Sequence, residues 1–522
     1  MFLENQVPPN DPRKDTVYQN FAANLGDIVA AGMNSGAKVV LNTVAVNLKD
    51  SPPFASLSNT NLPAADHQRF GQFFAEAKTL QSQSNYLAAA ELFAQAVKLD
   101  PQHAEAHYRL AQCELELTNA AAPEQFQMAC DTDALPFRSD TRINSAIRKL
   151  AQQRAGDRLV FCDAEHGLAQ ASPAHITGDE AFYEHVHFNF DGSYRLGKLW
   201  AEQIGQRLLA QGSLPATTNW ATQAACDQKL GLSIWNRQFV LQAVMRRFGA
   251  PPLSTQYNNA ERLKRLTDAE LKLREQEAQP DAVQRVRDVY AAAIATAPSD
   301  NYLYEGLANF LEAIKDKQGA IAAYRKMCEL LPNHFYACFQ LGRLLREQGQ
   351  PAQGEPFLEI AAQLRPSLPD SWFELGNCLS AQQKYDRALE CMERAAHLRP
   401  QESSYVCYTG QMLAKLNRHA EAIEHFRRAI KMTPNLWEAH FELAGELVAA
   451  DQPEEAMNEF SAVLKINPRH VTSHLNLGVM LVRFDRLDEA MACFQNALTI
   501  EPDNRTAQEY LASVRAHKSK KP

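Results

Sequence analysis

The segment FYEHVHFNFDG (182–192) carries residues whose types and spacing suit acid–base chemistry. Glu184 precedes His187 by three residues, so its carboxylate can orient the imidazole, which can then act as a general base. His185 and His187 could also be paired metal ligands, but alternate residues of an extended segment point in opposite directions. We therefore predict Glu184 and His187 as candidate catalytic residues, and we expect no metal ion and no cofactor.

Two short apolar runs rich in β-branched residues are expected to position this segment. They are AKVVLNTVAVNL (37–48) and RLVFCD (158–163), and continuous runs of this kind are typical of strands in a parallel sheet buried on both faces. Helix-like segments precede, separate and follow them, at about 16–35, 141–154 and 192–211. The order helix, strand, helix, strand, helix predicts half of an open α/β sheet.

Three polar residues come directly after the second predicted strand. Asp163, Glu165 and His166 could lie near the site, although residues in such a position more often cap a loop.

The C-terminal half is a sequence repeat marked by proline. Proline recurs at one constant interval seven times, at Pro298, Pro332, Pro366, Pro400, Pro434, Pro468 and Pro502. In one interval, a first helix is marked by Trp372, Leu375, Gly376 and Leu379, and a second by Ala388, Met392 and Ala395. The small residues allow two helix backbones to approach closely, and the proline ends the second helix.

This pattern resembles the tetratricopeptide repeat, with which it shares a period of about 34 residues. The resemblance spans six full units (301–504), with a half unit before them (about 281–297) and a capping helix after them (505–516). Gly354 and Thr409 are the most irregular positions. The resemblance implies an α-solenoid of six to seven repeats whose first helices line a concave surface.

Seven residues lie one or two positions from the core stripe of the first helices. We predict that this surface is a groove for a protein or peptide, although each residue taken singly could instead be shaped by packing alone. Arg343 and Arg346, with Asn377, could bind a carboxylate. The candidate groove residues are Tyr336, Phe339, Arg343, Arg346, Phe373, Asn377 and Phe441.

A further unit of the same kind is inserted between the two predicted strands. The spacing of a second repeat helix and of the proline that ends it recurs at Ala89, Phe93, Ala96 and Pro101. Another first helix then starts with His107, Leu110 and Ala111. The insertion follows the carboxyl end of the first strand, where open α/β sheets place their ligands. We expect it to overhang any site there.

The pattern Glu-x-x-His-x-Asn-x-x-Gly at 184–192 is similar to the last sequence block of the SGNH, or GDSL-type, ester hydrolases, in which Asp replaces Glu184. Together with NTVAVNLKDSPPF (42–54) and ALPFRSDTRINSAIRKLA (134–151), it resembles a bacterial group that fuses an SGNH-like domain to tetratricopeptide repeats. The resemblance covers about 1–212. It implies an incomplete flavodoxin-like α/β unit, with His187 as base and Glu184 as its acidic partner.

The nucleophile that this resemblance requires is missing. SGNH hydrolases carry their serine in a Gly-Asp-Ser block after the first strand, and no such block precedes Asn42. The chain as written is therefore expected to be inactive, or an ester hydrolase if active. A pair of parallel strands has only marginal stability on its own. Either another chain supplies the missing strands, or the start of the sequence is truncated, or the domain is a degenerate remnant. We favour truncation.

Composition narrows the partners and the compartment. Of 522 residues, 53 are Lys or Arg and 61 Asp or Glu, and this mild acidity argues against nucleic acid. We find no signal peptide and no apolar run that could span a membrane, so we expect a cytoplasmic protein. The ten cysteines form no CxxC pair, which indicates buried thiols rather than disulfides or a zinc site.

We therefore predict a protein-interaction scaffold with an incomplete or vestigial hydrolase-like domain; the alternative is an ester hydrolase whose nucleophile block is missing. The predicted parts are a partial SGNH-like α/β domain (1–65 and 131–212), an inserted helical unit (66–130), a helical adaptor (213–280), a tetratricopeptide solenoid (281–516) and a tail (517–522).

Overall fold

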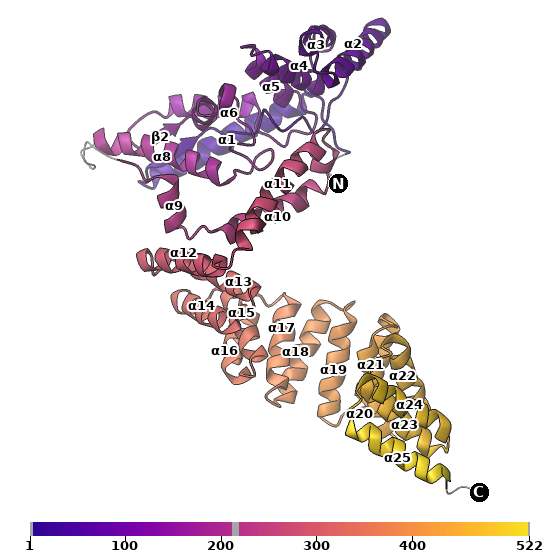
Figure 1. Ribbon diagram of the computed structural model, residues 1–522. Helices are drawn as coiled ribbons and strands as arrows, with labels where there is room; N and C mark the ends of the chain where they lie inside the picture. The colour runs from indigo at the N-terminus through magenta and orange to yellow at the C-terminus, as the bar shows by residue number, and fades with distance from the viewer. Residues whose placement is uncertain (1–3, 211–218, 520–522) are drawn as a thin grey trace. The chain divides into compact units, whose positions relative to one another are not determined.

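The computed structural model describes residues 4–210 and 219–519, which are mostly helical (Figure 1). The chain divides into an N-terminal unit, Met1–Ala297, and a C-terminal unit, Pro298–Pro522. The predicted boundary between 212 and 213 and the last three residues of the predicted tail lie outside the described residues.

The N-terminal unit contains the two predicted strands, in parallel. β1 (Val39–Asn42) pairs with β2 (Leu159–Cys162), with Val39 opposite Leu159 and Asn42 opposite Cys162. α1 (Arg13–Asn34) and α6 (Thr141–Gln153) pack on them through a core of Val29, Leu41, Ile147, Leu150 and Leu159, and α8 (Phe190–Ala210) lies against β2.

Within the described residues the sheet consists of these two strands alone, so the predicted half of an open α/β sheet is reduced to one parallel pair. The strand predicted at 37–48 ends at Asn42. Beyond it, the Asn144 side chain of α6 replaces a neighbouring strand, because its Oδ1 accepts from Val44 N at 2.8 Å and its Nδ2 donates to Val44 O at 3.0 Å. An incomplete flavodoxin-like or SGNH α/β unit is therefore not supported by the fold.

Four helices are inserted after β1 as two antiparallel pairs. They are α2 (Ala64–Ser82), α3 (Tyr86–Leu99), α4 (Ala104–Glu116) and α5 (Ala122–Asp131). Phe93 and Tyr108 are fully buried in their cores. The Tyr108 hydroxyl also donates to the Lys49 carbonyl at 2.6 Å, which ties the insertion to the loop after β1.

The rest of the N-terminal unit is a set of helices after β2. They are α7 (Ala164–Gln170), α9 (Gln223–Lys229), α10 (Ile234–Phe248), α11 (Asn259–Glu277) and α12 (Ala282–Thr296), with 3-10 turns at Pro173–His175 and Leu253–Thr255. α11 packs beside α10 and is anchored by Arg262, which is fully buried.

The C-terminal unit is a stack of six helix pairs closed by α25 (Arg505–Ser519) (Figure 1). Each first helix packs on its own second helix, and that helix packs on the next pair. The pairs are α13 (Asn301–Ala313) and α14 (Lys317–Leu330), α15 (Phe335–Glu347) and α16 (Pro351–Leu364), α17 (Pro369–Ser380) and α18 (Tyr385–Leu398), α19 (Ser403–Lys415) and α20 (His419–Met432), α21 (Trp437–Ala449) and α22 (Pro453–Ile466), and α23 (Val471–Arg483) and α24 (Leu487–Ile500).

Close packing inside each pair depends on a small residue at one position of the first helix. A Cβ on Gly410 would lie 2.8 Å from the Phe426 ring, and one on Gly478 would lie 2.5 Å from the Phe494 ring. Without side chains at these positions the large rings of the second helices reach the facing backbone, and they are buried.

The turn inside each pair has a residue with positive φ, at the same place in every repeat. Residues of this kind occur one repeat apart in the C-terminal unit and in the insertion, and they end the first helix in the left-handed conformation. They are Lys315, Gly349, Gln383, Asn417, Asp451 and Asp485, and Ser84 and Thr118. The insertion therefore has the turn geometry of the solenoid twice.

Candidate functional site

The candidate groove residues lie on three first helices of the C-terminal unit. Tyr336, Phe339, Arg343 and Arg346 are on α15, Phe373 and Asn377 on α17, and Phe441 on α21, and all seven are half-buried. Phe339, Phe373 and Phe441 occupy one equivalent repeat position, and Arg343 and Asn377 occupy another. Since one first helix occurs in each repeat, we treat the exposed side of these helices as one surface, which we call the first-helix surface.

The ring contacts of the predicted groove aromatics are with residues outside the predicted set. The Phe373 ring lies 5.0 Å from that of Tyr405 and 4.9 Å from that of Tyr408, both on α19. The rings of Phe339 and Phe441 belong to other contacts: the first stacks on Phe335 at 5.7 Å, and the second lies 4.9 Å from the His470 ring.

Sequence reasoning named no groove residue on α19, which lies between the helices that carry Phe373 and Phe441. Tyr408 is half-buried there and packs against Phe373. Its position, one repeat after Glu374 and one repeat before Glu442, is the sequence signal that could have identified it.

The two groove arginines are already paired with carboxylates. Arg343 donates to Glu312 Oε2 at 2.5 Å and to Glu347 Oε1 at 2.8 Å, and Arg346 donates to Glu374 Oε2 at 2.9 Å. Most of these pairs join one repeat to the next. The arginines therefore act first as links between repeats, and a ligand carboxylate would have to displace an existing partner.

Two other polar residues on this surface, Tyr336 and Asn377, differ in whether their side chains already have a hydrogen-bond partner. The Tyr336 hydroxyl donates to Asn309 Oδ1 of the preceding repeat at 2.8 Å. The carboxamide of Asn377 has no hydrogen-bond partner within residues 4–210 and 219–519. It is thus available to pair with the backbone of a bound peptide.

Glu184 and His187 are in contact, as the spacing suggested. The Glu184 carboxylate is 2% exposed and lies between the Nδ1 atoms of His185 and His187. Val186 N donates to it at 3.2 Å and His187 N at 3.3 Å. Burial alone would raise the pKa of Glu184, but hydrogen bonds and charge from His185 and His187 outweigh it and lower the pKa to about 2.

The two histidines differ in exposure. The His185 ring lies 4.9 Å from the Phe54 ring and is 17% exposed, whereas the His187 ring is 60% exposed. With Glu184 ionised and bonded to Nδ1 of His187, Nε2 is left as the basic nitrogen facing solvent. Within the described residues, no hydroxyl or thiol donates to that nitrogen.

Residues after β2 form a structural network instead. Asp163 accepts from His166 N at 3.3 Å and so caps α7, and its Oδ1 accepts from Arg148 at 2.8 Å and from Thr43 Oγ1 at 2.9 Å. Glu165 also accepts from Arg148, at 2.6 Å. These side chains hold the carboxyl ends of both strands together.

The described residues hold no group of three or more His, Cys, Asp or Glu placed to bind a metal ion. A solvent-open cavity of about 600 Å³ lies between α8 and α9, lined by Phe190, Trp220 and Leu230 among others, and it includes neither Glu184 nor His187.

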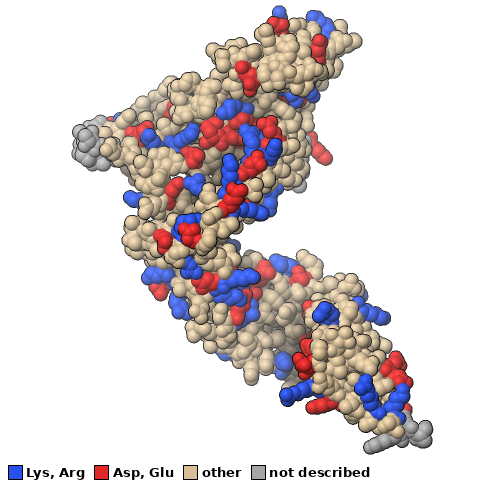
Figure 2. Space-filling view, viewed as in Figure 1, with Lys and Arg blue, Asp and Glu red and all other residues tan. Residues whose placement is uncertain are grey.

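No helix in 4–210 or 219–519 combines the length and apolar character that crossing a bilayer requires. Lys and Arg are interspersed with Asp and Glu on the face seen in Figure 2.

Comparisons with known families identify the repeats. One tetratricopeptide-repeat model matches residues 74–136, 280–334 and 379–436, and a second model of the same description matches 413–473 and 447–514. The chain therefore contains tetratricopeptide repeats, both in the solenoid and in the insertion, as this part of the resemblance predicted. None of these findings supports the SGNH-like part.

Several solved structures, among them a TPR protein, are similar over part of the chain. YrrB, described as having an unusual peptide-binding site, is 23% identical over 36% of this chain and 98% of its own, with a TM-score of 0.31. MamA is 20% identical over 33% and 94%, at 0.31, and pilF of Pseudomonas aeruginosa is 18% identical over 41% and 97%, at 0.36. No curated protein matches the chain.

Proposed function

We propose that the chain is a scaffold whose first-helix surface binds a peptide segment of a partner protein. The single observation that carries this proposal is the row of half-buried side chains on α15, α17, α19 and α21, which remain partly open to solvent after the helices have packed. Tetratricopeptide solenoids present such first helices as an extended binding surface.

The proposed ligand carries apolar anchors rather than an acidic cluster. Arg343 and Arg346 are already paired with glutamates, so the side chains that remain to contact a ligand on this surface are mainly aromatic. Phe373 and Tyr408 supply apolar faces on neighbouring helices, and the Asn377 carboxamide supplies polar groups for the peptide backbone.

The test is to select peptides against the full chain from a random library and to measure their affinities by fluorescence anisotropy. Asn377→Ala and Tyr408→Ala are expected to weaken binding about tenfold each, the usual loss for one interface contact. Phe484→Ala removes an exposed ring outside the first-helix surface and is the matched control. Equal affinities in all three variants would reject the proposal.

A second candidate function is ester hydrolysis, and one observation favours it. Glu184 holds Nδ1 of His187 while the ring faces solvent, which is the arrangement of a general base. A fluorophosphonate probe for serine hydrolases is expected to label an active chain and to lose that labelling in His187→Ala. Absence of labelling in the unmodified chain would leave the scaffold as its function.

A further inference from the structure

A second cavity lies in the N-terminal unit, apart from the first-helix surface. It has a volume of about 460 Å³ and is open to solvent between α10, α11 and the segment that leads from Asp179 into α8. A volume of this size is typical of sites for small molecules. Its apolar walls include Phe190, Leu241 and Leu266.

Positive charge is in excess around this cavity. Arg262 and Arg265, on successive turns of α11, share one carboxylate: Arg262 Nη2 lies 3.0 Å from Asp179 Oδ1 and Arg265 Nη2 lies 3.2 Å from Asp179 Oδ2. Asp179 also accepts from Asn47 Nδ2 at 2.8 Å. Lys272 lines the same cavity and has no ion pair within the described residues.

Neighbouring charges do not cancel this excess. Arg237, which also lines the cavity, is paired with Asp227 at 2.6 Å. Asp50 accepts from Asp179 N at 2.8 Å and lies 3.9 Å from the Lys49 ammonium. Asp179 is thus the carboxylate in the described lining, where it pairs with two guanidinium groups, and Lys272 adds a further positive charge to the same lining.

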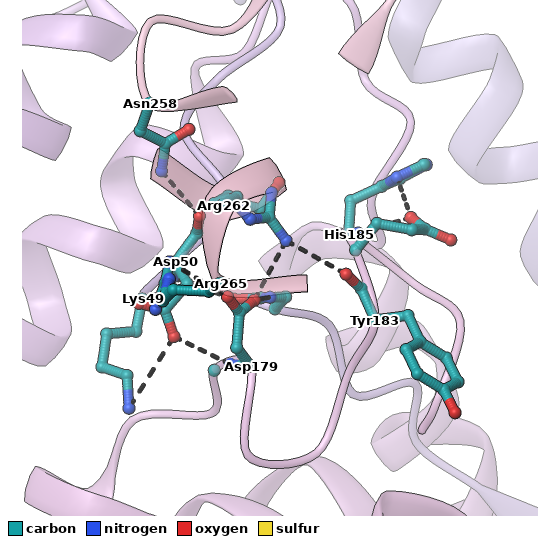
Figure 3. Close-up of polar contacts among 12 residues, drawn as sticks. Lys49, Asp50, Asp179, Tyr183, His185, Asn258, Arg262 and Arg265 are labelled. Carbon is teal, nitrogen blue, oxygen red and sulfur yellow. Dashed lines mark hydrogen bonds and ion pairs between the residues drawn. The ribbon is translucent and has the colours of Figure 1, made fainter. Parts of the chain in front are cut away.

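Arg262 is the most constrained of these cations (Figure 3). Its side chain is 1% exposed, and Figure 3 shows its guanidinium directed at Asp179 and at the Tyr183 carbonyl. Two of its nitrogens, Nε and Nη1, have no hydrogen-bond partner among the described residues. Both nitrogens are themselves buried and the guanidinium carbon lies 4.9 Å from the centre of the Phe248 ring, so what Arg262 contributes to the cavity is a fixed positive charge.

We propose that this cavity binds a small amphiphilic carboxylate. Its head group would accept hydrogen bonds from Arg265 and Lys272 beside Arg262, and its apolar body would lie along Phe190 and Leu266. A guanidinium matches a carboxylate with two parallel hydrogen bonds, and the apolar walls exclude water from the rest of the ligand. This site does not depend on the proposed peptide groove.

The test uses the full chain and two probes of equal length, octanoate and 1-octanol, titrated by calorimetry. Octanoate is expected to bind at least about tenfold more tightly than 1-octanol, because only octanoate pairs with the cations. Arg265→Gln is expected to raise the octanoate Kd about tenfold and to leave the 1-octanol Kd unchanged. Arg265 is about half exposed, so its replacement does not disturb the core.

The matched control is Lys264→Gln, which removes the same charge from an exposed position of α11 outside the cavity lining. Ala269→Phe, an exposed substitution within the lining, is expected to abolish binding of both probes by filling the cavity. The proposal is overturned if octanoate does not bind or if 1-octanol binds equally well. It is also overturned if Lys264→Gln matches Arg265→Gln, or if Arg265→Gln weakens both probes alike.

Discussion

At the scale of single residues, glutamates hold the neighbouring histidine and arginine side chains in place, at His187 and at Arg343 and Arg346. Glu184 and His187 are in contact because residues three apart in a tight segment are brought together by backbone bonds to the carboxylate. The sequence suggested that Arg343 and Arg346 could bind the carboxylate of a ligand. In the structure both pair with glutamates, most of them on neighbouring repeats. Partners in a neighbouring repeat depend on how the repeats stack, which a local pattern does not give.

The low pKa of Glu184 makes a pH-dependent contribution to stability. Its folded pKa of about 2 lies below the ordinary value of 4.5, so the stabilisation is present above about pH 4.5 and is lost as the pH falls toward 2. Glu184→Gln is expected to lower the free energy of unfolding by about 2–3 kcal/mol at pH 6 and by progressively less at pH 4 and pH 3. Urea unfolding at the three pH values measures this; a difference that does not change with pH would contradict it.

The thiols offer a second test at this scale. All ten cysteines are free, and Cys226 alone among them is not buried. Burial raises the pKa of Cys130 and of Cys407 to about 12, which keeps those thiols unreactive. We expect a disulfide reagent such as DTNB to modify one thiol in the native protein and ten after denaturation. Cys226→Ser should leave no reactive thiol in the native protein.

At the scale of helices, the constant proline spacing and the small-residue positions predicted every pair of the C-terminal unit. The left-handed turn residues were not predictable in the same way. Gly349, Asn417, Asp451 and Asp485 are residue types that favour this conformation, but Lys315 and Gln383 carry no turn signal. The strand at 37–48 was predicted too long, because apolar runs do not reveal that Asn144 caps the backbone after Asn42.

α16 contains two prolines whose positions give opposite expectations. Pro351 is its first residue, where proline is tolerated, whereas Pro356 is exposed and lies inside the helix, where it removes a backbone hydrogen bond. Pro356→Ala is expected to stabilise the C-terminal unit by about 1–3 kcal/mol, and Pro351→Ala by less than about 0.5 kcal/mol. Thermal unfolding followed by circular dichroism compares them, and equal effects would refute the expectation.

At the scale of the whole molecule, the sequence predicted a solenoid starting at 281, and a tetratricopeptide-repeat model matches from residue 280, while the division into compact units falls between Ala297 and Pro298. The reason is α12, whose sequence resembles a repeat helix but whose contacts lie with the N-terminal unit. The buried Tyr290 hydroxyl accepts from Asn236 Nδ2 of α10 at 2.9 Å. A pairing between segments so distant in the sequence is outside the reach of periodicity.

The C-terminal unit carries its own cores and all seven candidate groove residues. The fragment 298–522 is therefore expected to fold alone, with cooperative loss of helical signal on heating. It is also expected to bind a peptide selected on the full chain with a Kd within about twofold of that of the full chain. Failure of a folded fragment to bind such a peptide would place the peptide site elsewhere.

The stacking of helix pairs also has a mechanical consequence. Because each pair contacts chiefly the pairs on either side, a pull on the two ends of the C-terminal unit would detach one pair at a time from the stack. Each detached pair would release one repeat of chain, or about 110–120 Å of extended polypeptide. Under tension the end-to-end length of the unit would thus increase in steps of equal size, because every repeat contains nearly the same number of residues.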